Sequence, residues 1–234
     1  MIPATPVRWF IRLFTWHARS RLFGTFGRIR IAGLDALADT VAAGPVLVVA
    51  NHTTWWDPLV ALWLAHGELR AEAFAMMDAS NLRRLPFFGK VGAFGVDLAD
   101  RRDGARAIRY AAKLLDRPRR IVWIYPEGRE RSPFGPLELR PGAAAVARLS
   151  RAPIVPLASR FVFTAEEKPE LWIAIGPPVL EGSDLADAIG RQLARIDAVW
   201  GKEDPAGFVL AHRSAPGTVA RLAERLLAFF SRFF

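Results

Sequence analysis

A histidine and an aspartate five residues apart could form an acid–base pair in this chain. An imidazole titrates near neutral pH, so His52 could accept a proton from an attacking hydroxyl group. If the segment bends into a helix, Asp57 lies about one and a half turns further on, where its carboxylate can bind one ring nitrogen. We therefore predict that His52 is a general base and that Asp57 orients it. Such a pair also arises by chance, so its surroundings must support it.

A second polar segment, Glu127 to Arg131, offers groups that could bind an anion. Arg129 and Arg131 could donate hydrogen bonds to a phosphate, and Gly128 would let the backbone approach a ligand. Glu127 could hold one of the arginines in place. The alternative interpretation is a solvated charged turn, because runs of Arg and Glu are common on protein surfaces.

Both polar segments directly follow short apolar runs that are typical of buried strands, at 46–50 and 121–125. Further strands are expected at 73–77, 154–158 and 171–175, and helices at 59–64, 105–115, 143–149 and 183–200. This alternation predicts an α/β domain with a mostly parallel central sheet flanked by helices. Ligands bind outside the carboxyl ends of such strands, where His52 and Glu127 are expected to lie.

The composition excludes some kinds of chemistry and favours an anionic partner. The chain has no cysteine, which excludes disulfides and thiolate nucleophiles, and its histidines show no spacing that indicates a metal site. The net charge of +9 predicts attraction to nucleic acid, to an anionic membrane or to a phosphate ester. We expect no nucleic-acid binding, because no motif of that kind is present. The dominance of Arg over Lys favours a bacterial source.

The N-terminal residues favour the membrane among these partners. Six arginines occur in the first 34 residues without any acidic residue, and Trp, Phe and Leu stand between them. The arginines are Arg8, Arg12, Arg19, Arg21, Arg28 and Arg30. We predict an amphipathic helix over residues 5–23 that lies in the headgroup layer, with Trp and Phe facing the acyl chains. The arginines interrupt every apolar run, so neither a membrane-spanning helix nor a signal peptide is expected.

The C-terminal residues repeat this pattern. Apolar residues at helical spacing predict an amphipathic helix, and basic residues occupy its other face. The apolar residues are Val219, Leu222, Leu226, Phe230 and Phe233. Packing on the domain core and contact with a membrane are equally compatible with this pattern.

Taken together, four segments resemble the lysophosphatidic acid acyltransferase family of the glycerolipid acyltransferases. Asn51-His52 followed by Asp57 is similar to the first block of that family, and Tyr125-Pro126-Glu127-Gly128 is similar to the third. The second block is matched by residues 85–89 and 92–97 and the fourth by residues 152–157, and the resemblance covers roughly residues 30–180. We expect a helix over residues 1–26 at the membrane surface and an acyltransferase domain over residues 27–234 that includes the C-terminal helix.

The resemblance implies direct acyl transfer. His52 would deprotonate the hydroxyl of a lysophospholipid acceptor of the 1-acylglycerol-3-phosphate type, which would attack the thioester of acyl-CoA or acyl carrier protein. No cofactor, metal or acyl-enzyme is implied, and the chain has no nucleophile-elbow motif. The expected location is the cytoplasmic face of the cell membrane, as a peripheral or monotopic protein.

Two departures from the family pattern affect the acceptor side. Arg129 and Glu130 stand where the family has Thr and Arg, and Leu98 stands where an Arg is expected after Asp97. We assign substrate binding to a set that includes the nearest arginines, namely Asn51, Arg101, Arg102, Glu127, Gly128, Arg129 and Arg131. The departures leave two alternatives open: an aminolipid or glycolipid acceptor, or a relative that binds lipid without catalysis.

Overall fold

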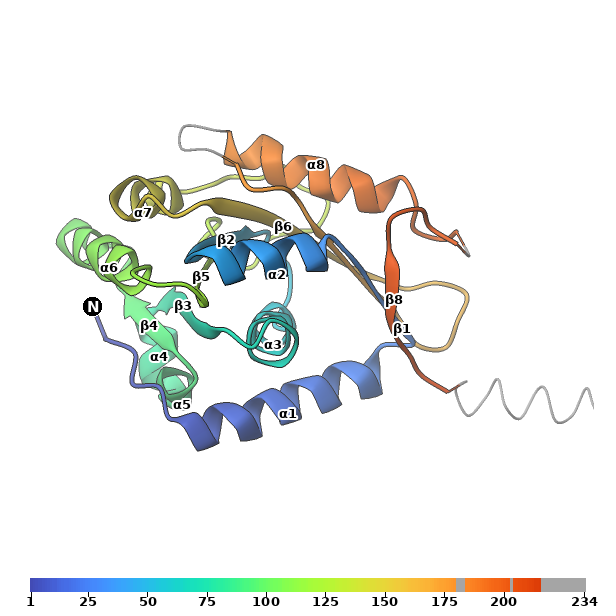
Figure 1. Ribbon diagram of the computed structural model, residues 1–234, viewed down its shortest axis with the longest axis horizontal. Helices are drawn as coiled ribbons and strands as arrows, with labels where there is room; N and C mark the ends of the chain where they lie inside the picture. The colour runs from blue at the N-terminus through green and yellow to red at the C-terminus, as the bar shows by residue number, and fades with distance from the viewer. Residues whose placement is uncertain (180–183, 203, 216–234) are drawn as a thin grey trace, which may run out of the picture.

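The computed structural model describes residues 1–179, 184–202 and 204–215 of this chain, and within them the strands form one eight-stranded sheet (Figure 1). The strand order is β4-β3-β5-β2-β6-β7-β1-β8. In chain order the strands are β1 Arg28–Ala32, β2 Val46–Ala50, β3 Glu72–Asp78, β4 Ala93–Val96, β5 Arg120–Ile124, β6 Ile154–Val162, β7 Glu170–Ile175 and β8 Val209–Arg213. The predicted C-terminal helix lies outside the described residues.

Most strand pairs in the sheet are parallel. β4, β3, β5, β2 and β6 pair in parallel, as do β7 and β1, whereas β6–β7 and β1–β8 are antiparallel. The prediction of a mostly parallel sheet flanked by helices is confirmed. Because β5, β2 and β6 are parallel neighbours, the segments that follow these strands meet at one edge of the sheet.

Helices cover both faces of the sheet. Figure 1 shows α1 and α3 on one side and α7 and α8 on the other. The helices are α1 Arg8–Thr25, α2 Leu34–Ala43, α3 Asp57–Leu62, the π-helix η1 Trp63–Glu68, α4 Ala79–Arg84, α5 Phe87–Lys90, α6 Arg101–Leu114, α7 Gly142–Ser150 and α8 Leu185–Asp197. Strand β2 is buried on both faces of the sheet. Val46 and Val48 pack in the core on one face, and Leu47 and Val49 pack in the core on the other. This explains its uninterrupted apolar run.

Several elements were not expected from the sequence. The strand Arg28–Ala32 lies within the arginine-rich first 34 residues that suggested an interfacial segment, and the helix Leu34–Ala43 directly follows it. Arg28 forms ion pairs with Glu170 and Glu166, and Arg30 is buried over the ring of Trp172. These two arginines therefore belong to the sheet and not to a membrane-binding surface.

Helix α1 packs against the domain along one side. Ala18 and Leu22 are fully buried, and Phe14 contacts the rings of Phe87 and Phe88. The expectation that the Phe side chains face acyl chains is therefore wrong for Phe14, because the core offers apolar contacts there. The opposite side of α1 exposes three large apolar residues, Trp9 (66%), Leu13 (51%) and Trp16 (66%).

Candidate active site

The site begins where β2 ends, at Asn51. Its buried side-chain amide donates to the carbonyl of Ser159 (3.1 Å) and accepts from the backbone N–H of Ser159 (2.9 Å) on the neighbouring strand β6. The amide group thus takes the place of a peptide group at the end of the β2–β6 pairing, which allows the backbone to turn away immediately afterwards. Asn51 has a structural role in presenting His52, and it does not line the cavity described below.

His52 and Asp57 are joined as predicted. The Nδ1 atom of His52 lies 2.9 Å from Oδ2 of Asp57, which is the first residue of α3. The same carboxylate oxygen accepts the backbone N–H groups of Thr53 (2.8 Å) and Thr54 (3.0 Å). An ionised carboxylate only accepts hydrogen bonds, so Nδ1 of the neutral imidazole carries the hydrogen and Nε2 has the free lone pair.

The segment after β5 supports the histidine from the other side. Oε2 of Glu127 accepts the backbone N–H of His52 at 2.7 Å, and the N–H of Arg131 donates to the carbonyl of His52 at 2.8 Å. The expectation that Glu127 holds an arginine is thus replaced by a contact with the histidine backbone. Burial raises the pKa of Glu127 above its usual value. Tyr125 stacks on the imidazole, with ring centroids 4.6 Å apart.

Gly128 is required by the backbone geometry at the site. Its φ of +72° lies in the left-handed region, and an added Cβ would lie 2.9 Å from Nε of Arg140. Arg140 therefore packs over the glycine, and both residues line the cavity. Sequence reasoning singled out Gly128 but missed Arg140, which lies twelve positions downstream outside any motif that was considered.

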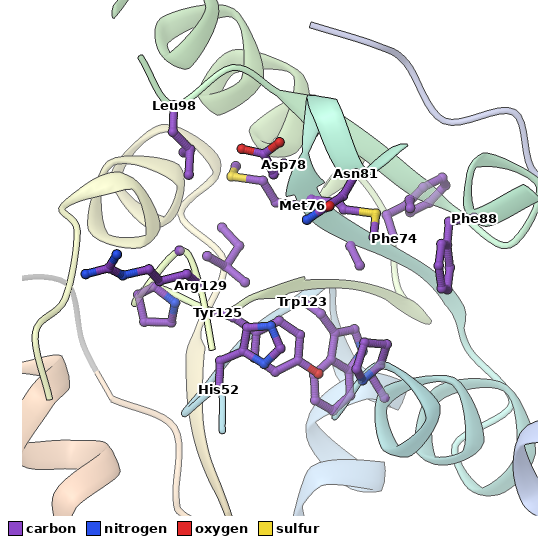
Figure 2. A pocket seen from close by; sticks show the side chains of 18 of the residues that line it. His52, Phe74, Met76, Asp78, Asn81, Phe88, Leu98, Trp123, Tyr125 and Arg129 are labelled. Atoms are coloured by element: carbon purple, nitrogen blue, oxygen red, sulfur yellow. The ribbon is translucent and has the colours of Figure 1, made fainter. Parts of the chain in front are cut away.

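The imidazole lies on the wall of a cavity of about 710 Å³. Figure 2 shows His52, Tyr125 and Trp123 on one side, Asp78, Asn81 and Met76 across from them, Arg129 at one end and Phe88 at the other. The Phe88 end is apolar, with Phe74 beside Phe88. The cavity can therefore hold an extended apolar group beside the base, with Arg129 at the other end.

The structure brings some of the predicted binding residues into this cavity and leaves others out. His52, Gly128 and Arg129 line it, and Asp57 and Glu127 are buried behind it. Arg101 and Arg102 do not line it, because they begin helix α6 as exposed residues after the cap Asp100. Arg131 also lies outside the lining, where it forms an ion pair with Glu138 at 2.7 Å. The assignment of Arg101, Arg102 and Arg131 to the ligand cavity is therefore not supported by their positions.

Other lining residues were missed because nothing in the local sequence marks them. Arg84 and Asn81 come from α4, and Asp78 ends β3 and caps that helix by accepting the N–H of Ser80. Trp55 and Trp56, which follow His52 closely in the sequence, do not line the cavity, and Trp56 packs against Phe26.

No metal site is formed by the part of the chain that the structure describes, since it contains no group of three or more His, Asp or Glu side chains that could hold an ion. Outside the cavity, His212 lies with Nε2 2.9 Å from the carbonyl of Phe23, and its ring stacks on the ring of Phe23.

The chain belongs to the acyltransferase family, whose model matches residues 28–160, more than half of its length. A 1-acyl-sn-glycerol-3-phosphate acyltransferase of Streptococcus pneumoniae (strain ATCC BAA-255 / R6) is 28% identical over 115 residues. That match covers 47% of this chain and 40% of the relative, less than half of either protein.

A solved structure supports the fold. The 1-acyl-sn-glycerophosphate (LPA) acyltransferase PlsC from Thermotoga maritima has a TM-score of 0.60 to this chain at 15% sequence identity, with 82% of this chain and 81% of that chain covered. At this identity the likeness shows a shared fold.

Proposed function

We propose that this protein is an O-acyltransferase that moves a fatty acyl group from a thioester, acyl-CoA or acyl carrier protein, to the hydroxyl of a lysophospholipid of the 1-acylglycerol-3-phosphate type. The observation that carries the proposal is the pairing of His52 Nδ1 with Asp57 Oδ2 at 2.9 Å, with the imidazole on the wall of a large, partly apolar cavity. Family membership supports the same reaction class.

In the proposed reaction, Nε2 of His52 takes the proton of the acceptor hydroxyl as its oxygen attacks the thioester carbonyl carbon. The new C–O bond forms, the C–S bond breaks, and the departing thiolate takes the proton from the imidazolium. Asp57 stabilises the imidazolium and fixes the ring orientation. No covalent enzyme intermediate is needed, which agrees with the absence of cysteine from the chain.

The two ends of the cavity suggest how the substrates lie. The apolar end near Phe74 and Phe88 fits an acyl chain, Arg129 lies at the other end, and Arg140 lines the cavity beside Gly128. Neither of these arginine side chains has an ion pair within the described residues, so both are available for an anionic headgroup. Arg84 lines the same cavity from α4.

One observation favours a second candidate, the same transfer to an aminolipid or glycolipid. Leu98, which stands where the family pattern has an arginine, lines the cavity, and so do Asp78 and Asn81. The pKa of Asp78 is lowered by the hydroxyl of Ser80, which favours a carboxylate that could bind an ammonium or hydroxyl group.

The test is acyl transfer by the purified full chain, with acyl-CoA or acylated carrier protein and a panel of lysolipids analysed by mass spectrometry. Transfer to lysophosphatidic acid would support the first candidate, and transfer only to acceptors without phosphate would support the second. His52→Ala should lower turnover by about two to four orders of magnitude, whereas His17→Ala, on the exposed surface of α1, should not. Turnover unchanged by His52→Ala would contradict the proposed mechanism.

We also propose that the protein docks peripherally on an anionic membrane through α1. Trp9, Leu13 and Trp16 occupy one exposed side of this helix, and the exposed Arg8 and Arg12 lie beside them. Among the described residues, no helix is both long and apolar enough to cross a bilayer. The proposed location is the cytoplasmic face of the cell membrane.

A further inference from the structure

A serine on strand β6 contacts the aspartate of the candidate dyad from behind. Ser159 is buried, with 3% of its surface exposed, and its Oγ lies 3.2 Å from Oδ1 of Asp57. It is more than one hundred residues from both His52 and Asp57 in the chain. Nothing in the sequence pattern marked this residue.

The hydrogen bonds of the Asp57 carboxylate define what the serine does. Oδ2 accepts three hydrogen bonds, from the His52 ring and from the backbone of Thr53 and Thr54. For Oδ1, the hydroxyl of Ser159 is the side-chain donor found within the described residues. A carboxylate has no hydrogen to donate, so the serine hydroxyl must donate in this contact.

The position of Ser159 is itself fixed. The side-chain amide of Asn51 binds both its N–H (2.9 Å) and its carbonyl (3.1 Å). Asn51 directly precedes His52. Its side-chain amide therefore connects the segment that contains His52 to Ser159, the residue that contacts Asp57. The serine hydroxyl therefore stands at a set distance from the carboxylate and needs little reordering to bind it.

We propose that Ser159 is a positioning residue that holds Asp57 with Oδ2 aimed at His52, so that Nε2 faces the acceptor hydroxyl. This inference rests on the proposed acyltransferase function. Without the serine hydroxyl, Oδ1 of Asp57 stays buried but loses this hydrogen-bond donor, and the carboxylate is freer to rotate. The negative charge of Asp57 is then stabilised by fewer hydrogen-bond donors, so it stabilises the protonated imidazole of His52 more strongly. The neutral imidazole that acts as base therefore forms at higher pH.

The experiment compares three variants of the full chain. Ser159→Ala removes the hydroxyl. Ser159→Thr and Ser159→Val introduce side chains of nearly equal size, of which only threonine has a hydroxyl. We expect kcat to fall about tenfold in the Ala and Val variants with KM nearly unchanged, and the Thr variant to lie close to the parent protein. The acidic limb of the kcat/KM profile should move to higher pH in the Ala and Val variants only. Equal losses in Thr and Val, or no loss in Ala and Val, would overturn the proposal.

A second measurement separates this proposal from the function on which it rests. Proton NMR follows the His52 Nδ1–H that faces Asp57, with His52→Ala identifying the signal. Slower exchange with water in the parent and Thr variant than in the Ala and Val variants would support the positioning role without any turnover. If exchange is equal in all four proteins, the role of Ser159 is refuted, whereas a parent protein that transfers no acyl group refutes only the proposed function.

Discussion

The phenol of Tyr125 donates a hydrogen bond of 2.9 Å to the backbone carbonyl of Asp57, the residue that begins α3. The same ring stacks on His52, so one side chain contacts both members of the dyad. Burial, reinforced by the nearby negative charge of Asp57, raises the pKa of Tyr125 well above its usual value. The phenol therefore remains a donor throughout the pH range of an assay.

Tyr125→Phe should weaken the dyad while preserving the ring contact. We expect the free energy of unfolding to fall by about 1 kcal/mol and kcat to fall severalfold, because the start of α3 loses its hydrogen bond to the residue that follows β5. Urea denaturation and steady-state kinetics measure the two effects. Tyr110→Phe is the matched control, since that hydroxyl binds the N–H of Ala4 away from the dyad. A control variant with the same loss of kcat would contradict the prediction.

Gly128→Ala should destabilise the protein by about 1–2 kcal/mol, because its φ of +72° is unfavourable for any residue with a Cβ. The new methyl group would also displace Arg140, so KM for an anionic acceptor should rise. Thermal or urea unfolding tests the first effect and kinetics the second. Gly104→Ala in α6 is the control: no atom lies within 4 Å of the added Cβ, and a gain of about 0.5–1 kcal/mol is expected there.

Asp103 should make stability depend on pH in the acidic range. The N–H of Asp97 and, next, the amino-terminal ammonium group lower the pKa of this carboxylate from 3.8 to about 2. A lowered pKa in the folded state means that the stabilisation is present above pH of about 3.8 and is lost as the pH falls towards 2. Asp103→Asn should therefore lower the urea midpoint at pH 6 but have little effect near pH 2. The exposed Asp39→Asn serves as control, and a difference that does not change with pH would contradict the assignment.

Replacing Trp9 and Trp16 together by Ser should weaken binding to anionic vesicles by at least about tenfold, because each exposed indole would otherwise bury a large apolar surface. Flotation with vesicles that contain phosphatidylglycerol measures the change. Phe134→Ser removes a ring that is 95% exposed and follows Pro133, whose carbonyl binds Arg160, which also binds Asp197 of α8, and it should leave flotation unchanged. Equal flotation of the double variant and the parent would refute docking through this helix.

The sequence was sufficient for the parts of the site that are local. The spacing from His52 to Asp57 and the apolar run before Asn51 predicted the dyad and its place after a strand, because both depend on neighbouring residues. It could not reveal Ser159 or Arg140, whose roles arise from strand pairing and from a left-handed glycine. It also grouped Arg101 and Arg102 with the binding residues, whereas in the structure they follow the cap at Asp100 and begin a helix outside the cavity lining.

Helix α1 contributes to the core that surrounds α3, and the aspartate of the dyad begins α3. Leu22 and Phe26 are almost completely inaccessible to water in the folded protein. A shortened expression product that starts at residue 27 would therefore expose apolar surface of α3 and η1 and should aggregate, even though the family match begins at residue 28. For protein production, the chain should therefore keep its first helix.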